Sequence, residues 1–514
     1  MKSKEILKVI DVFAGPGGLG EGFAAFKKDG ENPFNLSLSI EKDPAAHATL
    51  LLRSFYRHFD TENVPEDYWH YLKGNITREA LFARFPRQFA SASSEARCLE
   101  LGKTSNEDVK ALISKKLKDS RRWVLVGGPP CQAYSVVGRV RMRSFNPDFE
   151  KDERHFLYLE YLKILADHQP PVFVMENVKG MLSAQHSGGR IIERILSDLR
   201  QPGLAISGRK TGLGYKLFSL IEKTTDNEVE PSAFLVKAED YGIPQTRHRV
   251  LIVGIRNDID ITPERLSKAK APSISDVIGD LPRIRSTLSK EFDSLSAWKN
   301  ILSAVTSEKW YSKGRSNGLY STVQHIDQAL DLLEDSNLTP GAEILKYRGK
   351  PKINGKWYRA GCDSIVTNHA GRGHMRSDLH RYLFASSFAA ANGRSAQLSD
   401  FPDALLPTHK NVYAGIANDH FSDRFRVQIK DRPSTTITSH ISKDGHYFIH
   451  YDPSQCRSLT VREAARLQTF PDSYKFEGNR TSQYHQVGNA VPPLLSVQIA
   501  EIVYDILKRV RFDG

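Results

Sequence analysis

Short apolar runs recur through the first half of the chain and predict buried β-strands. Each run is rich in β-branched residues and is bounded by glycine, proline or charged residues. Between the runs, apolar residues return with helical spacing, most clearly at 156–166 and 191–199. This alternation predicts an α/β fold with a mostly parallel sheet and helices on both faces. The predicted strands are 9–13, 36–40, 123–126, 172–175 and 250–255.

The pattern changes after Ile255. From about 257 to 430 the chain mixes polar and aromatic residues without a sustained strand–helix rhythm. We therefore predict a first domain over 1–256, a smaller irregular domain over 257–481, and a C-terminal segment over 482–514 that returns to the first. In this segment a predicted helix follows the two prolines at 492 and 493. Its apolar face is formed by Leu495, Ile499, Ile502, Val503, Ile506 and Val510.

Composition narrows the class of protein. The 514 residues include 72 Lys and Arg against 60 Asp and Glu, a formal surplus of +12 that suits a polyanionic partner. Four cysteines, none in a C-x-x-C pair, argue against a disulfide scaffold or a cysteine zinc ribbon and fit a reducing compartment. No apolar run approaches the ~20 residues that cross a bilayer, and the first residues lack the pattern of a secretory signal. We expect an intracellular protein without membrane association.

A glycine-rich loop follows the first predicted strand. Glycines at 15, 17 and 20 satisfy G-x-G-x-x-G at a strand-to-helix turn, where the backbone can bend tightly and approach a ligand closely. The second strand ends at Glu41, whose carboxylate is placed to accept hydrogen bonds from ribose hydroxyls. These features predict a nucleoside-containing cofactor, and by themselves they fit a nicotinamide dehydrogenase equally well. A glycine-rich turn that binds no ligand is the structural alternative.

Cys131 differs from the cysteines at 98, 362 and 456, which we interpret as ordinary structural residues. It follows the third predicted strand, within Gly-Gly-Pro-Pro-Cys-Gln at 127–132. Open α/β sheets hold substrates at the carboxyl ends of their strands, and the two prolines fix the turn that leads to the thiol. Because a free thiol is only slightly ionised at neutral pH, a nucleophilic role requires a helper or a cationic setting.

Charged residues lie at two more strand ends. Glu176 comes directly after the strand at 172–175, while Arg247 and Arg249 precede the strand at 250–255. Alternate residues of an extended segment point to the same side, so we expect the two guanidiniums to face one way. A thiol, an acid and two guanidiniums at sheet ends form the convergence that is typical of an enzyme active site.

Together these motifs resemble the DNA cytosine-5 methyltransferase family, of the bacterial or phage restriction-modification type. The resemblance covers about 8–255 and 421–510, in the family's order and spacing. Six segments are similar to family motifs: the glycine loop, PPCQ at 129–132, ENV at 176–178, QTRHR at 245–249, RSLTVREAARLQTFPD at 457–472 and QVGNAVPP at 486–493.

The resemblance implies a Rossmann-like domain that transfers a methyl group from S-adenosylmethionine to carbon 5 of a cytosine in a specific DNA sequence. Cys131 would add to carbon 6 of the base, and Glu176, protonated or sharing a proton, would serve N3. Arg249, supported by Arg247, would stabilise charge that develops near O2. None of this chemistry is possible inside a stacked duplex, so the cytosine must be flipped out.

The resemblance also implies the cofactor site, with S-adenosylhomocysteine as product and no metal. The family meets the adenine amino group with an Asp in a Gly-Asp-Ile turn, and the best match here places Asn75 instead. An asparagine oxygen still accepts that hydrogen bond. The implied cofactor residues are Phe13, Ala14, Gly15, Pro16, Gly17, Gly18, Glu41, Lys42, Asn75, Ile76, Pro130, Leu157, Asn489 and Val491.

Double-stranded DNA is the implied partner of a monomeric enzyme in the bacterial cytoplasm, alongside a cognate restriction endonuclease. Basic stretches at 346–359 and 368–381 are candidate DNA contacts in the target-recognition domain, and a solvated charged face is their alternative. Histidines at 369, 374 and 380 lack the spacing of a metal site. RNA cytosine-5 methylation and a catalytically silent DNA-binding regulator are the alternative functions. The residues expected at DNA are Gln132, Ser135, Arg139, Arg141, Arg143, Lys346, Arg348, Lys350, Lys352, Arg372 and Arg376.

Overall fold

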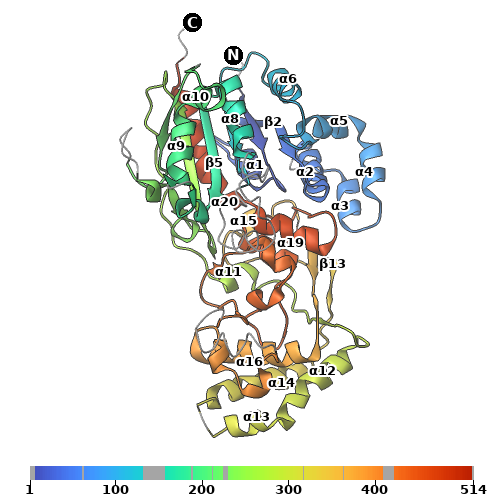
Figure 1. The fold of residues 1–514 in the computed structure, drawn as a ribbon. Coiled ribbons are helices and arrows are strands. Elements are labelled where there is room, and N and C mark those ends of the chain that lie inside the picture. Colours follow the sequence, from blue (N-terminus) through green and yellow to red (C-terminus); the bar gives the residue numbers. More distant parts are fainter. Residues whose placement is uncertain are drawn as a thin grey trace. The chain divides into compact units, whose positions relative to one another are not determined.

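The computed structural model divides into two compact units, whose elements are drawn in Figure 1. The larger unit comprises 1–65, 78–270 and 490–514, and the smaller unit comprises 66–77 and 271–489. The structure describes residues 6–60, 63–130, 157–186, 189–210, 212–223, 230–316, 318–362, 364–408 and 422–511.

The larger unit is built on one sheet with the strand order β3-β2-β1-β4-β5-β11-β8, and β9 also pairs with β11. The strands from β3 to β5 run parallel, whereas β11 is antiparallel to its neighbours. The chain leaves β1 toward β2 on one side and reaches β4 on the other, and ligands of open α/β sheets bind at such a switch point. The strands are β1 (Leu7–Val12), β2 (Phe34–Glu41), β3 (Ala96–Cys98), β4 (Trp123–Gly127), β5 (Val172–Val178), β8 (Tyr215–Phe218), β9 (Leu235–Lys237) and β11 (His248–Arg256).

Helices cover both faces of this sheet, with a hydrophobic core under each layer (Figure 1). Because neighbouring residues of a strand point to opposite faces, β1 places Val9 in one core and Ile10 in the other. Helices α1 and α20 pack in the first core, and α6, α8 and α9 pack in the second. The helices of this unit are α1 (Gly18–Ala25), α2 (Pro44–Arg57), α4 (Arg78–Arg84), α5 (Pro86–Glu95), α6 (Asn106–Leu117), α8 (Leu157–His168), α9 (Ile191–Arg200), α10 (Pro202–Ser207) and α20 (Pro493–Arg509).

The α/β fold predicted from the apolar runs is confirmed. Each predicted strand overlaps an observed strand of the central sheet, and the helical spacings at 156–166 and 191–199 correspond to α8 and α9. The periodic face at the end of the chain forms α20, which packs on α1 in the core of the same unit.

The smaller unit contains more regular structure than its sequence suggested. Its main core is helical and includes Trp298, Ile326 and Tyr382, which are all fully buried. A β-hairpin of β13 and β14 lies in the same unit. The principal elements are α3 (Glu66–Leu72), α11 (Ile274–Ile278), α12 (Leu295–Ser303), α13 (Lys309–Gly314), α14 (Tyr320–Glu334), β13 (Gly341–Lys346), α15 (Gly355–Tyr358), β14 (Ile365–Ala370), α16 (Arg376–Asn392), α18 (Val461–Leu467) and α19 (Arg480–Asn489).

The two units divide the chain at other positions than the sequence suggested. The observed breaks fall at 270/271 and 489/490, against the expected 256/257 and 481/482, and α3 joins the smaller unit. Tyr68 of α3 donates a hydrogen bond to the Ser473 carbonyl at 3.5 Å, and the Tyr71 hydroxyl donates to Glu477. These long-range bonds are the physical reason that a segment near residue 70 belongs with residues near 475.

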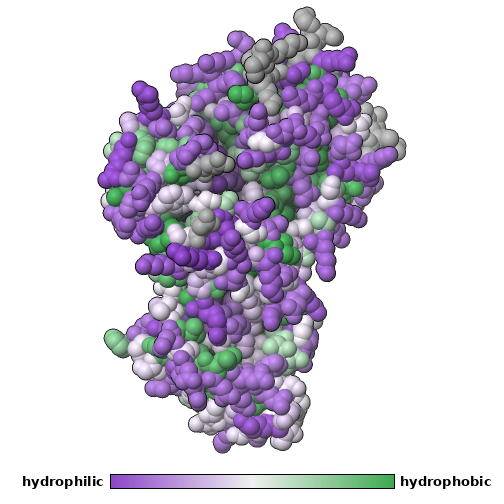
Figure 2. Space-filling model, turned by 180° about the vertical axis from the view of Figure 1, so that it is seen from behind, coloured by the Kyte–Doolittle hydropathy of each residue, from purple (hydrophilic) through white to green (hydrophobic). Residues whose placement is uncertain are grey.

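Hydrophilic residues predominate on the face drawn in Figure 2, where hydrophobic residues gather only in small patches. Within the described part of the chain, the stretch Arg480–Arg509 is long and apolar enough to cross a membrane by length and composition alone. Its most apolar window is 67% buried inside the protein. The packing of α20 in the core therefore accounts for these apolar residues.

Candidate active site

The glycine loop after β1 has an unusual backbone. Phe13, Gly15 and Gly17 have φ angles of 56°, 58° and 97°, all in the left-handed region. Gly17 is the N-cap of α1, and its carbonyl accepts the first helical hydrogen bond from Glu21 at 2.8 Å. Such a backbone is costly for residues with a Cβ atom, so the glycines at 15 and 17 are needed for the turn itself.

Glu41 at the end of β2 holds this loop in place. Its carboxylate accepts hydrogen bonds from the backbone N–H groups of Gly15 at 2.7 Å, Lys42 at 2.9 Å and Asp43 at 2.7 Å. A Cβ atom added at Gly15 would meet nothing within 4 Å, so the space beside the loop is open. An open cradle beside an acid at a strand end fits a nucleoside cofactor.

Close packing behind the loop fixes α1 against the sheet. A Cβ atom at Gly20 would lie 2.6 Å from Leu36 Cδ2 and 2.9 Å from Asp11 Oδ2. A Cβ atom at Gly22 would lie 2.3 Å from Ser496 Cβ on α20. These two glycines therefore serve helix packing rather than ligand approach.

Asp11, a fully buried acid in β1, was not among the predicted site residues. It is 1% exposed, and its carboxylate lies beside the backbone of Gly20 in α1. Burial, together with the negative charge of Glu41, raises the pKa of Asp11 to about 8. The signal in the sequence was an acid inside an otherwise apolar strand.

A second buried acid, Glu21, anchors the same helix and was also missed. Arg53 of α2 donates to it from Nε at 3.0 Å and 3.1 Å, and Arg57 donates from Nη1 at 3.3 Å. Arg57 also forms an ion pair with Glu95. No local pattern marked this network, because its arginines lie 32 to 38 residues along the chain from the acids that they bind.

The catalytic candidates converge at the carboxyl ends of β4 and β5. Glu176 Oε1 lies 3.0 Å from Arg249 Nε, and β11 places Arg249 beside β5 in antiparallel register. A Cβ atom at Gly128 would lie 3.0 Å from Glu176 Oε2. The Asn177 side chain donates a hydrogen bond to the Pro129 carbonyl at 3.1 Å. The turn that leads to Cys131 is thus tied to the strand that carries Glu176.

The two arginines at this edge are held away from solvent. Arg247 is 1% exposed and the side chain of Arg249 is 16% exposed. Burial, followed by the neighbouring Arg249, holds the pKa of Arg247 well below its ordinary value, and Glu176 offsets only part of this. Burial also lowers the pKa of Arg249, and Glu176 acts in the opposite direction by raising it. Among the described residues, burial is thus the main cause that lowers the pKa of both arginines, and Glu176 acts against it.

The other predicted site residues divide among the larger unit, the smaller unit and the part of the chain outside the described residues. Lys42 is exposed beside Glu100, Leu157 begins α8, and Pro130 is half-buried. Asn75, Ile76 and Asn489 belong to the smaller unit, where Asn75 lies 3.1 Å from a His70 ring nitrogen. The predicted residues that lie outside the described ones are Cys131, Gln132, Ser135, Arg139, Arg141 and Arg143.

The basic stretches of the smaller unit divide between surface and core. Trp357 donates from its indole N–H to the Thr469 carbonyl at 2.8 Å, and Arg359 is 4% exposed, so this end of 346–359 is structural. His369 is buried and contacts Thr460 and the Pro282 carbonyl. The exposed members are Lys346, Arg348, Lys350, Lys352 and Arg376, and Arg372 is half-buried.

Comparison with known proteins identifies the family. The family described as C-5 cytosine-specific DNA methylase matches residues 92–505. The type II methyltransferase M.Bpa9945I of Bacillus paralicheniformis is 34% identical over 522 residues, which cover 97% of this chain and 99% of that protein. The chain belongs to the C-5 cytosine-specific DNA methylase family.

Other matches agree with this assignment. The type II methyltransferase M.AgeI of Thalassovita gelatinovora is 25% identical and covers 97% of this chain and 99% of that protein. A crystal structure of a predicted DNA modification methyltransferase encoded within an E. coli prophage superposes with a TM-score of 0.51 at 19% identity, over 98% of this chain and 100% of that one. The enzyme is thus an S-adenosylmethionine-dependent DNA cytosine-5 methyltransferase of the restriction-modification type.

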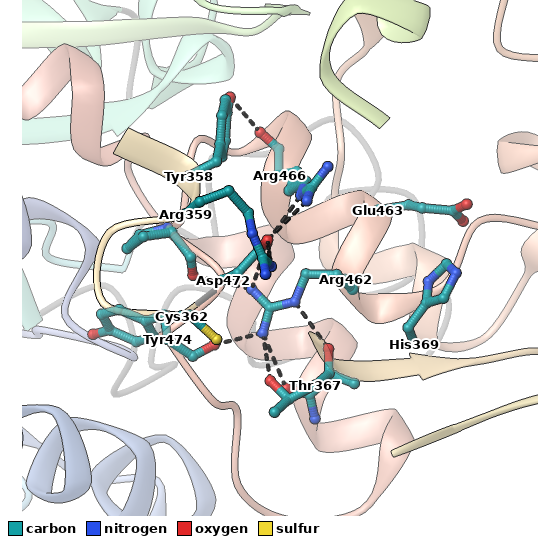
Figure 3. Close-up of polar contacts among 12 residues, drawn as sticks. Tyr358, Arg359, Cys362, Thr367, His369, Arg462, Glu463, Arg466, Asp472 and Tyr474 are labelled. Atoms are coloured by element: carbon teal, nitrogen blue, oxygen red, sulfur yellow. Dashed lines mark hydrogen bonds and ion pairs between the residues drawn. The ribbon is translucent and has the colours of Figure 1, made fainter. Parts of the chain in front are cut away.

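One family-like segment of the enzyme proves to be structural. The segment 457–472 forms α18 and its flanks, and its three arginines are at most 1% exposed. Arg457 makes two hydrogen bonds of 2.7 Å to Glu463. Arg466 makes two to Asp472 at 2.9 and 2.7 Å (Figure 3). Thr460 and Glu463 form a capping box that begins α18. We call Arg359, Arg457, Arg462, Arg466, Glu463 and Asp472 the buried arginine cluster.

Carbonyl groups complete the cluster. Arg462 donates to the carbonyls of Thr367 at 2.9 Å, Pro471 at 3.1 Å and Tyr474 at 2.7 Å. Arg359 donates to Asp472 at 2.7 Å (Figure 3). Burial, partly offset by Asp472, lowers the pKa of Arg462 to about 10. The cluster joins segments of the smaller unit that lie about a hundred residues apart.

Proposed function

We propose that the enzyme methylates cytosine through a covalent bond between the Cys131 sulfur and carbon 6 of a flipped-out base. The observation that carries this proposal is the Glu176–Arg249 pair at 3.0 Å, beside the turn that ends at Pro130. Cys131 is the next residue in the chain. A nucleophile, an acid and a fixed cation would then meet around one ring.

Each group answers a need of the reaction. Carbon 5 of cytosine is a weak nucleophile until a thiolate adds at carbon 6, which pushes electron density into the ring. Glu176 would hold a proton at N3, and Arg249, with Arg247 behind it, would stabilise negative charge near O2. The burial of both guanidiniums and the 3.0 Å approach of Arg249 to Glu176 support that role. Carbon 5 would then take up the electrophilic methyl group. Loss of the carbon-5 proton would restore the ring double bond and release the Cys131 sulfur.

The glycine loop and Glu41 are the proposed holders of S-adenosylmethionine, which supplies an electrophilic methyl group when bound. The Glu41 carboxylate would accept hydrogen bonds from the ribose hydroxyls in place of some of those it now accepts from backbone N–H groups. Phe13 would lie against the adenine. The left-handed backbone at Gly15 and Gly17 leaves the space that this cofactor needs. S-adenosylhomocysteine would be the product, and no step requires a metal.

The proposal extends to the biological setting. The relatives carry type II methyltransferase names, and we infer a monomeric bacterial enzyme that modifies one DNA sequence in the cytoplasm. A restriction endonuclease that cuts the same sequence would be its functional partner.

Covalent trapping tests the mechanism. On duplex DNA with 5-fluorocytosine at the target position, wild-type enzyme should form a stable complex that survives denaturation, and Cys131→Ala should form none. Cys98→Ala is the matched control, because Cys98 is exposed in the same unit and its loss leaves the core intact. Trapping or methyl transfer by Cys131→Ala would overturn the proposal. Bisulfite sequencing of DNA from cells that express the enzyme would identify the target sequence.

A further inference from the structure

A hollow of about 820 Å³ lies within the smaller unit. Its wall includes the start of α19, the segment around Lys475, and parts of β13 and of 442–443. None of the residues assigned above to catalysis or to the cofactor lines it. The cations in the wall are Arg372, Lys443, Lys475 and Arg480, and the acids are Glu343 and Glu477.

The acids of the wall are already engaged. Glu343 accepts a hydrogen bond from the Asn368 side chain at 3.0 Å, and Glu477 accepts one from the Tyr71 hydroxyl. Lys475 lies 3.7 Å from Glu477, with its ammonium 3.8 Å from the centre of the Tyr71 ring. Lys475 therefore offsets the charge of Glu477, and Glu343 is held by an amide donor.

Three cations have no such partner. Within the described ranges, Arg372, Lys443 and Arg480 form no ion pair with a carboxylate. Arg372 donates to the Ser442 carbonyl at 2.8 Å and lies over the Tyr484 ring, 5.2 Å from its centre. Arg372 and Arg480 both act electrostatically on Tyr484, which places them near one another. We call these three residues the basic rim.

The first turn of α19 adds donors to the same wall. Arg480 and Thr481 are its first two residues, whose backbone N–H groups have no partner inside the helix. The Asn479 side chain caps the next turn by accepting from Ser482 at 2.9 Å. A helix N-terminus together with three unpaired cations forms a strong site for an oxyanion.

Gln483 distinguishes among anions. Its side chain is 4% exposed and lines the hollow, and its Oε1 has no hydrogen-bond partner among the described residues. A ligand that satisfies this wall carries a hydrogen-bond donor as well as phosphate oxygens. DNA offers both, in its backbone and in the amino groups of its bases, whereas a phosphodiester group by itself carries no donor at neutral pH.

We propose that this hollow binds the phosphate backbone of the DNA substrate through Arg372, Lys443 and Arg480. The inference rests on the proposed function, since its ligand is the DNA on which Cys131 acts. A phosphate contact positions the duplex and carries no sequence information. The basic rim would thus contribute affinity and salt dependence without choosing the target.

The test measures duplex binding by Arg372→Gln, Lys443→Gln and Arg480→Gln as single and triple variants. Each single variant should raise the Kd by about 3–10-fold at low salt and lower the slope of log Kd against log salt by about 1. The loss should be equal for target and non-target duplexes, while kcat at saturating DNA stays at the wild-type value. Lys313→Gln is the matched control, an exposed cation of α13 in the same unit but outside the hollow.

Three results would overturn the inference: wild-type Kd and salt slope in the triple variant, a loss confined to the target sequence, or saturable binding of sodium phosphate with unchanged DNA affinity. Lys443 is exposed, so its single variant tests the site independently of folding, and thermal midpoints verify the others. Binding does not require the thiol. Repeating the titration in a Cys131→Ala background therefore separates failure at the rim from failure of the proposed covalent mechanism.

Discussion

Two regions of the enzyme bury arginines beside carboxylates, and the pKa of Arg466 in one shifts in the opposite direction to the pKa of Arg247 and Arg249 in the other. At the sheet edge of the larger unit, burial lowers the pKa of Arg247 and Arg249 more than Glu176 restores it. In the buried arginine cluster, burial also acts to lower the pKa of Arg466, but Asp472 and Asp280 reverse the effect, and the pKa ends above its ordinary value. The pKa of Arg247 and of Arg249 is thus lowered, whereas that of Arg466 is raised.

In the buried arginine cluster, a carboxylate also has a pKa that is set by its charged partner rather than by burial. Burial by itself would raise the pKa of Glu463, but Arg457 holds it well below its ordinary value. A structural charge network is complete without a ligand, while a site that stabilises developing negative charge is not. Burial alone therefore does not distinguish the two kinds of arginine, and the balance of their partners does.

Removing one member of the cluster should have the largest effect. Arg466→Met leaves Asp472 and Asp280 without their strongest partner, and we expect the free energy of unfolding of the smaller unit to fall by about 3–5 kcal/mol. Urea denaturation monitored by tryptophan fluorescence measures this. Arg432→Met, at an exposed arginine of the same unit, should change it by less than about 0.5 kcal/mol. Equal stability of the two variants would contradict the structural role of the cluster.

Neutralising the sheet edge should affect catalysis more than stability. Arg249→Met with Glu176→Gln removes both members of the pair together. For the buried Arg247, loss of the attracting Glu176 is offset by loss of the repelling Arg249, so the thermal midpoint should stay near that of wild type. Methyl transfer should fall by at least about 10²–10³-fold. The control is Arg256→Met with Asp258→Asn, an ion pair at the other end of β11. If the double variant is active but has a lowered thermal midpoint, Glu176 and Arg249 stabilise the fold rather than take part in catalysis.

Asp11 should make stability depend on pH. Its pKa is about 8 in the folded protein and near 3.8 when unfolded, so the folded state holds the proton more tightly. The stability that this proton provides is complete below pH 3.8 and is lost as pH rises toward 8, by up to about 1.4 kcal/mol per pH unit. Asp11→Asn should remove this loss. Its advantage over wild type in urea midpoint should thus grow between pH 5 and pH 8, and a constant difference would contradict the assignment.

The smallest effect is expected at the exposed part of the 346–359 stretch. Lys350→Gln with Lys352→Gln should leave the thermal midpoint unchanged, because both side chains are exposed. If each contacts a phosphate, the slope of log Kd against log salt should fall by about 0.9 per residue. An unchanged slope would limit this stretch to its structural end at Trp357 and Arg359.

The catalytic half of the molecule was largely predictable, because its signals are local. Strand periodicity predicted β1, β2, β4, β5 and β11, and the motifs placed Glu176 and Arg249 at strand ends. Their pairing at 3.0 Å follows from the adjacency of β5 and β11. The helices of the smaller unit were missed, in part because α16 is buried around much of its circumference and so lacks a clear polar face.

The sequence by itself determined the α/β fold, the family and the chemical groups available for catalysis, since each depends on local period or on a short motif. Only the tertiary structure decided which charges are structural. Arg359 stands in a stretch that predicts DNA contact, yet its partner Asp472 lies 113 residues away and buries it. Arg372 and Arg480, of the same residue type, meet no such acid within the described chain and line an open hollow. Whether an arginine is buried in an ion pair or lines an open surface depends on which carboxylates lie within a few ångströms of it in the folded protein. No local pattern in the sequence specifies that distance.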